Sequence, residues 1–506
     1  MSKPQSVQPA GHPGDEPVPR EAWHALWAMV FGFFMILVDS TIVSVATPAL
    51  MEAFGADVTG VLWVTSSYLL AYAVPLLITG RLGDRVGPKR IYMVGLVVFT
   101  AASLLCGLAP SLTWLIIARV IQGLGAAMMT PQTMAVITRT FPAARRGPAM
   151  ALWGATAGVA TLVGPIAGGL LIDAISWEWI FFINVPVGII GLVLAWRLVP
   201  NLETHSHSFD WIGVVLSAVG LFCGVFAIQE GRTYDWGQLW GPISIPLLLA
   251  VGAVLLVVFL WWQARNRREP LVPLRLFRDR NFSVSNVAVT AVGFAVTGLI
   301  FPFMLYAQLV RGLSPTGAAL LLAPQAVVSI LMAPIIGRLV DRLHPRLVAG
   351  LGLAVLAGSL ALLSLVMRPD SPTWLIMVVA VAMGLGMSAV WGPLSTSANR
   401  NLPRELAGAG AGIYNTTRQM GSVMGSAAIA ALMTARLAAH LPGAGQGGPG
   451  QGGPIEHAGA LPAPLREPFA RAMAESMLMP AAVVALALVA ALFYENSKHL
   501  QRPPAR

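Results

Sequence analysis

Two ionisable residues lie inside long apolar stretches of the sequence. Asp39 lies about midway along the stretch 24–48, and Arg119 lies within the stretch 112–137. At the centre of a membrane helix a charged side chain costs about 2.5–3.5 kcal/mol, and such residues are usually functional. A carboxyl at this depth could carry a proton from one face of a membrane to the other. The alternative roles are structural: Asp39 could bond neighbouring hydroxyls, and Arg119 could hold two helices together.

Polar side chains at helical spacing accompany both residues, and they recur around Arg418 in the second half of the chain. Residues three, four or seven positions apart share one face of a helix. These faces predict a substrate cavity, with helix–helix hydrogen bonds as the alternative. No acid lies at mid-depth in the second half, so the substrate need not be a cation. The expected cavity residues are Ser40, Ser44, Gln122, Met129, Asn415, Arg418 and Gln419.

A short charged sequence motif occurs twice. GRLGDRVGPKR stands at 80–90 and GRLVDR at 337–342, each at the end of an apolar stretch. A repeat in matching positions indicates an internal duplication, which is how many secondary transporters are built. An acid and an arginine in such a loop could join adjacent helix ends in one conformation; the alternative is an ordinary basic loop. The expected residues of this latch are Gly80, Asp84, Arg85, Gly87, Arg90, Asp341 and Arg342.

The composition of the 506-residue chain is that of a membrane protein. Hydrophobic residues make up 56% and charged residues 11%, against about 25% charged residues in soluble proteins, and the mean hydropathy is +0.72. Runs of about 20 apolar residues can cross a bilayer as helices. We place fourteen spans near 24–48, 58–80, 91–110, 112–137, 147–172, 177–199, 209–229, 242–263, 282–310, 315–340, 346–367, 373–395, 405–436 and 472–494.

The spans predict an all-α polytopic fold of two six-helix bundles with two additional helices between them. The expected bundles cover residues 24–199 and 282–494, and the inserted pair covers 209–263. The remaining segments are a cytoplasmic tail at 1–23, a basic cytoplasmic linker at 264–281, a flexible Gly/Pro-rich external loop at 437–471, and a cytoplasmic tail at 495–506. Within the linker, apolar residues alternate with arginines at 268–280, and we expect this segment to lie along the cytoplasmic membrane surface.

The basic residues are unevenly divided between the two sides of the predicted membrane. With an even number of spans both termini share one side, and that side carries 24 of the 32 Lys and Arg residues while the other carries six. Lys and Arg are enriched in cytoplasmic loops, so both termini are expected in the cytoplasm. This division explains the net charge of +10 without nucleic-acid binding. The two cysteines and the His205/His207 pair give no metal-site pattern.

Several segments together resemble the major facilitator superfamily, in its fourteen-helix drug:proton antiporter branch. The motif at 80–90 is similar to the loop motif that follows the second helix of the family. The segment LVDSTIVSVATPAL at 37–50 is similar to the first-helix signature of this branch. RVIQGLGAAM at 119–128 resembles the fourth-helix motif of proton-linked members, and WEWIFFINVPVG at 177–188 resembles the start of the sixth helix, although Glu178 replaces the usual arginine. The resemblance implies that Asp39 and Arg119 take part in proton coupling.

A Gly-Pro pair interrupts the fifth predicted span, within GPIAGG at 164–169, which resembles the antiporter motif of the same family. Gly164 and Gly168 are one turn apart, so another helix could approach closely, and Pro165 removes a backbone hydrogen bond and bends the helix. We expect these residues and Gly169 to seal the transport path on one side. The alternative is a role in packing alone.

The combined prediction is a proton-coupled multidrug efflux antiporter that exports amphipathic or lipophilic compounds across the bacterial inner membrane. The sequence has no GxxxxGK[ST] phosphate loop, so the proton gradient is the expected energy source. No cofactor, metal or nucleic acid is expected, the lipid bilayer is the surrounding partner, and a monomer is the expected state. The alternatives are an exporter dedicated to one metabolite, lipid or siderophore, and an integral-membrane transferase, which would need catalytic acids or histidines near one interface.

Overall fold

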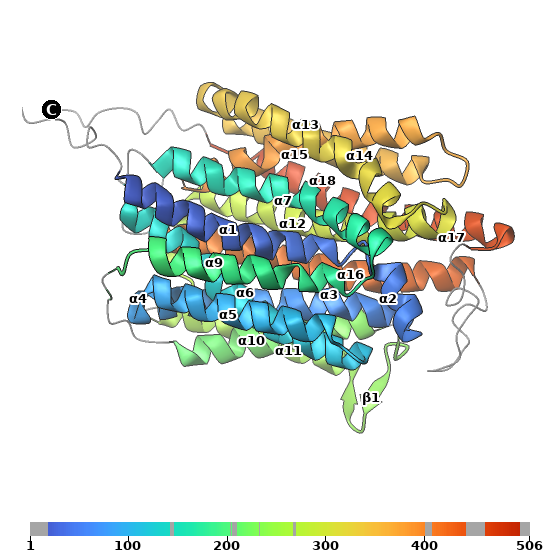
Figure 1. Ribbon diagram of the computed structural model, residues 1–506, viewed down its shortest axis with the longest axis horizontal. Helices are drawn as coiled ribbons and strands as arrows, with labels where there is room; N and C mark the ends of the chain where they lie inside the picture. The colour runs from blue at the N-terminus through green and yellow to red at the C-terminus, as the bar shows by residue number, and fades with distance from the viewer. Residues whose placement is uncertain are drawn as a thin grey trace, which may run out of the picture.

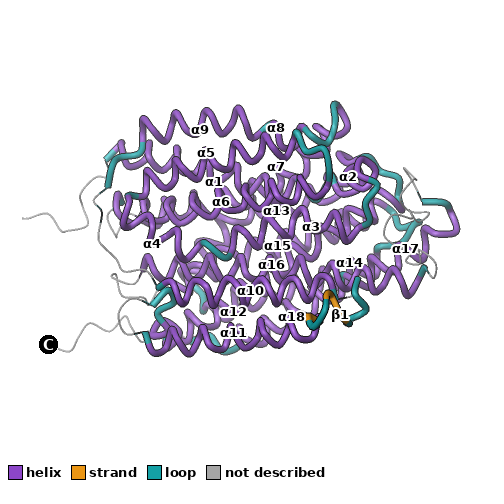
Figure 2. The backbone as a smooth tube through the Cα atoms, turned by 90° about the horizontal axis from the view of Figure 1, so that it is seen from below, coloured by secondary structure: helices purple, strands orange, loops and turns teal. Residues whose placement is uncertain are grey.

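The computed structural model is a bundle of long helices that run side by side (Figure 1). It describes residues 19–141, 146–202, 204, 210–231, 233–266, 270–399, 407–441 and 461–495. The described chain begins and ends at the same end of the bundle, which we call the terminal end. The opposite end carries a small β-hairpin and is called the far end (Figures 1 and 2).

The first half of the chain forms a bundle that is interrupted in three places. Its helices are α1 (Arg20–Ile42), α2 (Thr47–Phe54), α3 (Val58–Ala73), α4 (Leu76–Val86), α5 (Pro88–Gly107), α6 (Leu112–Thr140), α7 (Arg146–Ala174), α8 (Trp179–Phe182) and α9 (Asn184–Leu198). The predicted span 58–80 is divided into α3 and α4 before Pro75, since proline lacks the N–H that would continue the helix. Turns at 43–46 and at Ile183 likewise divide the first and sixth spans.

The second half forms the inserted pair and the second bundle. Its elements are α10 (Trp211–Glu230), β1 (Gln238–Trp240), β2 (Ile243–Ser244), α11 (Ile245–Arg265), η2 (Leu274–Arg278), α12 (Arg280–Leu305), the π-helical turn η3 (Tyr306–Val310), α13 (Pro315–Arg342), α14 (Pro345–Val366), α15 (Thr373–Asn399), α16 (Ala407–His440), α17 (Ala463–Ser476) and α18 (Leu478–Ala491). The helices α16 and α17 extend into the segment 437–471 that we expected to be loop, so the predicted loop boundaries were too wide.

The all-α polytopic fold is confirmed. Among the described residues, twelve helices are long and apolar enough to cross a membrane, and two shorter apolar segments, Val58–Ala73 and Val163–Ala174, overlap the two remaining predicted spans. The number fourteen therefore stays a prediction. Exposed tryptophans lie near both ends of the bundle, a distribution typical of membrane-interface belts: Trp27, Trp196, Trp211 and Trp261 at the terminal end, and Trp114, Trp179 and Trp374 at the far end.

The inserted pair lies at the edge of the bundle rather than at its centre (Figure 1). The helix α10 packs on α11 and contacts α3 of the first half and α16 of the second, so the pair covers the seam between the halves. At the terminal end, Asp210 caps α10 and accepts hydrogen bonds from Trp262 and Gln263 of α11, each 2.7 Å long. Partial burial raises the pKa of the Asp210 carboxyl, but these bonds and that from the Gly213 N–H outweigh burial and hold the pKa below its ordinary value.

The linker that follows α11 packs against the protein. Leu271 and Leu276 are buried, at 6% and 2% exposure, and the Val272 N–H donates to Gln263 Oε1 over 3.0 Å. These two apolar side chains thus pack in the protein core, and the position of the linker at the membrane surface stays a prediction.

The two halves meet mainly along α3 with α16 and along α7 with α13. Near the far end, Thr59 bonds Thr434 at 3.1 Å and the Gln308 amide donates to the Val45 carbonyl at 3.0 Å. At mid-depth, Ser66 bonds Ser426 at 2.6 Å. These contacts hold the halves together at mid-depth and toward the far end.

Candidate functional site

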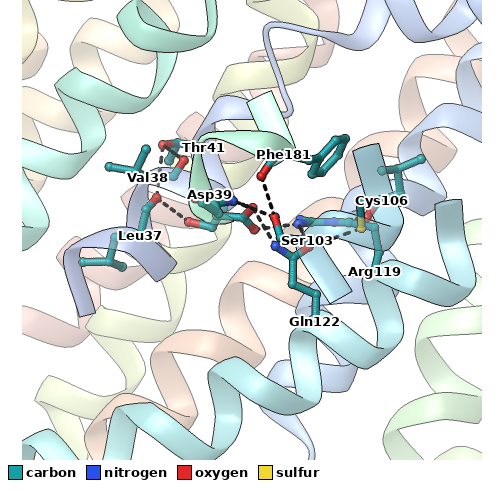
Figure 3. A network of polar contacts seen from close by, with 12 residues as sticks. Leu37, Val38, Asp39, Thr41, Ser103, Cys106, Arg119, Gln122 and Phe181 are labelled. Atoms are coloured by element: carbon teal, nitrogen blue, oxygen red, sulfur yellow. Dashed lines mark hydrogen bonds and ion pairs between the residues drawn. The ribbon is translucent and has the colours of Figure 1, made fainter. Parts of the chain in front are cut away.

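Asp39 is the centre of a buried polar network (Figure 3). Its Oδ2 accepts a hydrogen bond and ion pair from Arg119 Nη1 at 2.6 Å. Its Oδ1 accepts from Gln122 Nε2 at 2.9 Å and from Asn184 Nδ2 at 2.8 Å. The side chains of Asp39 and Arg119 have 0% exposure. The carboxylate is thus held by donors from α6 and α9, two different neighbours of α1.

Arg119 is held by more than its ion pair. Its Nε donates to the Val64 carbonyl on α3 at 3.1 Å, and its Nη1 also donates to Gln122 Oε1 at 2.7 Å. The guanidinium carbon lies 4.0 Å from the centre of the Tyr68 ring, a cation–π contact. Its Nη2 has no hydrogen-bond partner among the described residues. The two N–H groups of Nη2 are therefore available for a different partner when the environment of Arg119 changes.

Asn184 was not expected at this site. It is the first residue of α9, directly after the turn at Ile183, and this break directs its amide toward α1. Asn184 Nδ2 also donates to Ser103 Oγ at 3.0 Å, and Ser103 donates to the Phe181 carbonyl at 2.9 Å. In the sequence, Asn184 is a single amide side chain in an otherwise apolar span. It lies in the segment 177–188, which resembles the start of the sixth helix of the family.

The network contains one acidic and one basic side chain, both fully buried. With Asp39 ionised, the pair with Arg119 is neutral overall. Protonation of Asp39 would leave Arg119 as an uncompensated buried cation, and breaking one partner of a buried pair typically costs about 3–5 kcal/mol. An uncharged side chain at position 39 would therefore require a different arrangement of the groups around Arg119.

The expected cavity residues of the first half take different positions. Gln122 and Met129 are fully buried within the first bundle, Gln122 in the Asp39 network and Met129 in the apolar core. They do not lie on a surface open to substrate in this conformation. Ser44 is buried and donates to the Thr41 carbonyl at 2.6 Å, whereas Ser40 is half-buried and donates to the Leu37 carbonyl.

The expected cavity residues of the second half lie together on α16. Asn415 and Gln419 are buried, at 8% and 4% exposure, and Arg418 is half-buried. The guanidinium carbon of Arg418 lies 5.8 Å from the centre of the Trp391 ring on α15. The structure thus brings an arginine of α16 and an aromatic ring of α15 together.

The latch is described in part. Gly87 has φ of 108°, a conformation that favours glycine, and it ends α4 and precedes α5. A Cβ at Gly80 would lie 3.6 Å from Pro131 Cβ on α6, and Arg85 and Arg90 are exposed at the terminal end. The side chains of three other latch residues lie outside the described part of the structure: Asp84, Asp341 and Arg342.

The glycines of α7 allow close approach to two different partners. A Cβ at Gly164 would overlap Thr41 Oγ1 and lie 3.0 Å from the Val38 carbonyl oxygen, and one at Gly168 would lie 2.7 Å from Ile42 Cγ1. Both contacts fall on the part of α1 that flanks Asp39. A Cβ at Gly169 would instead lie 2.6 Å from the Thr316 backbone nitrogen on α13. The neighbouring Pro165 is buried within α7.

The described residues contain no group of three or more His, Cys, Asp or Glu that could hold a metal ion. The thiols of Cys106 and Cys223 are free and buried. Cys106 Sγ contacts Gln122 Oε1 at 3.6 Å and so touches the Asp39 network.

Known proteins similar to this chain are membrane transporters. The model of the Major Facilitator Superfamily matches residues 29–426. The uncharacterized MFS-type transporter Rv1250 of Mycobacterium tuberculosis is 51% identical over 94% of this chain and 81% of its own length. The tetracenomycin C resistance and export protein of Streptomyces glaucescens is 32% identical over 95% of this chain and 93% of its own. The multidrug export protein EmrB of Haemophilus influenzae is 31% identical over 82% of this chain and 81% of its own length.

A solved structure supports the fold. A bacterial homologue of the human lysosomal transporter Spinster, in an inward-facing and unoccupied conformation, superposes with a TM-score of 0.61 at 18% identity, covering 96% of this chain and 99% of its own. The family match spans most of the sequence and includes Asp39, Arg119, Asn184 and Arg418. The chain therefore belongs to the major facilitator superfamily, a family of membrane transporters and not of enzymes.

Proposed function

We propose that this protein is a proton-coupled antiporter that exports amphipathic or lipophilic compounds across the bacterial inner membrane. The observation that carries the proposal is the Asp39–Arg119 pair, fully buried and joined at 2.6 Å. Similar proteins whose names state drug resistance and export support the direction of transport. Proton entry can supply the energy, since one charge crossing 100 mV releases about 2.3 kcal/mol.

The proposed cycle begins with protonation of Asp39. Loss of the negative charge releases Arg119, whose unpartnered Nη2 can then take a new acceptor. The movement reaches α7 because the glycines at 164 and 168 touch α1 beside Asp39, and it reaches the second half because Gly169 touches α13. The contacts between halves at mid-depth and the far end must then separate for the path to open at that end.

The orientation in the membrane belongs to the same proposal. Most of the Lys and Arg residues that the structure describes lie at the terminal end, including exposed Arg85 and Arg275, and positive residues are retained in the cytoplasm. The terminal end is then cytoplasmic, the far end faces outward, and both chain termini lie inside the cell.

An exporter dedicated to one compound is the second candidate. It is favoured by the name of the Streptomyces glaucescens relative, which specifies a single compound. The two candidates differ in breadth: a multidrug exporter should transport several unrelated amphipathic compounds, whereas a dedicated exporter should transport one.

Transport by purified protein in proteoliposomes tests the proposal. Under an imposed pH gradient, we expect export of at least several dyes or antibiotics that stops when a protonophore is added. Asp39→Asn should abolish this transport, while Glu52→Gln, which removes an exposed acid on α2, should leave it intact. Transport that continues without a proton gradient would contradict the coupling mechanism.

A further inference from the structure

Arg418 is a membrane-embedded charge that the proton network does not use. It lies on α16, half-buried, beside the Trp391 ring on α15 at 5.8 Å. It is within electrostatic range of the Tyr414 hydroxyl on its own helix and of the Tyr72 hydroxyl on α3. The guanidinium therefore lies near side chains of both halves of the protein.

No acid in the sequence lies at the depth of Arg418 in the second half. Between residues 280 and 455 the sequence contains three acids, all close to helix ends: Asp341 in the last turn of α13, Asp370 after α14 and Glu405 before α16. In the first half Asp39 is already bound to Arg119. The described structure shows no ion pair at Arg418. Its charge is permanent, because guanidinium is not deprotonated in proteins.

The surroundings of Arg418 add hydrogen-bond donors and aromatic surface. The Tyr414 hydroxyl is buried and has no hydrogen-bond partner among the described residues. The Gln419 amide follows Arg418 directly, and Asn415 lies one turn before it on the same face. A guanidinium can bind a carboxylate through two parallel hydrogen bonds, a geometry that lysine cannot offer. A cation placed here would meet like charge without a neutralising carboxylate.

We propose that this site selects acidic aromatic compounds as substrates. Arg418 binds the carboxylate, sulfonate or phenolate of the substrate, while Trp391, whose ring lies beside the guanidinium, contacts the ring system of the substrate. The inference rests on the export function proposed above and adds the charge of the exported compound. A cationic compound is disfavoured at the same position.

Three probes that share one ring system and differ in charge test the selection: 2-naphthoate, 2-naphthylmethanol and 2-naphthylmethylammonium. Binding is measured by equilibrium dialysis against the full-length protein in lipid nanodiscs, with empty nanodiscs as the reference for partition into lipid. The wild type should bind naphthoate most tightly. Arg418→Gln should weaken naphthoate binding by roughly 10- to 100-fold, the range expected for one charge-assisted hydrogen-bonded contact, and change binding of the alcohol by less than about 3-fold.

Two further variants keep the test decisive. Arg418→Glu should make the ammonium probe the tightest, and Arg418→Lys should retain part of the preference for naphthoate. The matched control is Arg436→Gln on the same helix, where the arginine is 47% exposed and pairs with Glu475; this variant should behave as the wild type. Size-exclusion profiles confirm that each variant is folded.

The outcomes separate this inference from the proposed function, because binding requires no proton gradient. Equal or tighter binding of the ammonium probe by the wild type overturns the inference, as does unchanged naphthoate binding in Arg418→Gln or no naphthoate binding at all. Charge-selective binding without pH-driven transport would support the selection by Arg418 and refute proton-coupled export.

Discussion

Replacing Gly168 with valine tests whether the glycine face of α7 holds the proton site in position. A Cβ at residue 168 would lie 2.7 Å from Ile42 Cγ1 and 3.1 Å from the Ile42 carbonyl oxygen. Non-bonded carbon atoms normally lie about 3.5–4.0 Å apart, so α1 and α7 must separate by about 1 Å. Ile42 is one helical turn beyond Asp39. A shift of this size would lengthen the 2.6 Å contact between Asp39 and Arg119 beyond hydrogen-bonding distance.

The expected result is a protein that assembles but leaks protons. Overpacking of this kind typically costs about 1–3 kcal/mol, which a folded protein can tolerate, whereas the site itself depends on distances below 3 Å. In proteoliposomes containing a pH-sensitive dye, Gly168→Val should dissipate an imposed pH gradient without substrate. Pro165→Ala keeps the glycine contacts and removes the constraint on the backbone, so it should lose export with less leak.

The matched control for this variant is Gly358→Val on α14, because a Cβ at Gly358 would meet no atom within 4 Å. It makes the same chemical change in another membrane helix and should maintain the pH gradient as the wild type does. If Gly168→Val is well expressed and keeps both the gradient and normal export, the glycine face serves packing alone, and the proposed link from α7 to Asp39 is refuted.

The other predictions concern the proton site, the latch and the topology. Asp39→Asn should insert normally, since the proposed cycle passes through an uncharged Asp39, yet fail to accumulate substrate against a gradient in vesicles; active accumulation would make Asp39 structural. Asp84→Asn should lower the rate of transport with little change in substrate affinity. Asp341→Asn should have a weaker effect of the same kind, since its loop lacks counterparts of Gly87 and Lys89. A large loss of substrate affinity in a binding measurement would refute the latch. Gly450→Cys should react with an impermeant maleimide in whole cells, whereas Arg275→Cys should react only after permeabilisation. The reverse pattern would show that the terminal end faces outward, opposite to the proposed orientation.

The sequence was sufficient to identify apolar helices and the two buried charges of the Asp39–Arg119 pair, because charge in an apolar stretch is visible without a structure. It was not sufficient to pair them. Asp39 and Arg119 are 80 positions apart, and their contact depends on α1 and α6 being neighbours in the bundle. Asn184 was missed because its direction is set by the turn before α9, and a turn inside an apolar span leaves little trace in composition.

Burial was harder to predict than helix position. In a membrane protein both lipid-facing and core-facing residues are apolar, so hydropathy does not distinguish them. Met129 was assigned to a cavity from its helical face, yet it packs in the core of the first bundle with 0% exposure. Leu271 and Leu276 belong to an amphipathic segment whose composition does not show that the protein covers these two side chains. Only the tertiary arrangement resolves such cases.

The lack of an acid near Arg418 has a bioenergetic consequence if the exported compound is an anion. Outward movement of a monovalent anion and inward movement of one proton transfer charge in the same direction, so each cycle moves two elementary charges across the membrane. At 100 mV this contributes about 4.6 kcal/mol, enough for roughly a thousand-fold concentration gradient even without a pH difference. One-for-one exchange of a monovalent cation for a proton would move no net charge. The arginine on α16 would then determine how strongly the electrical part of the proton-motive force powers export.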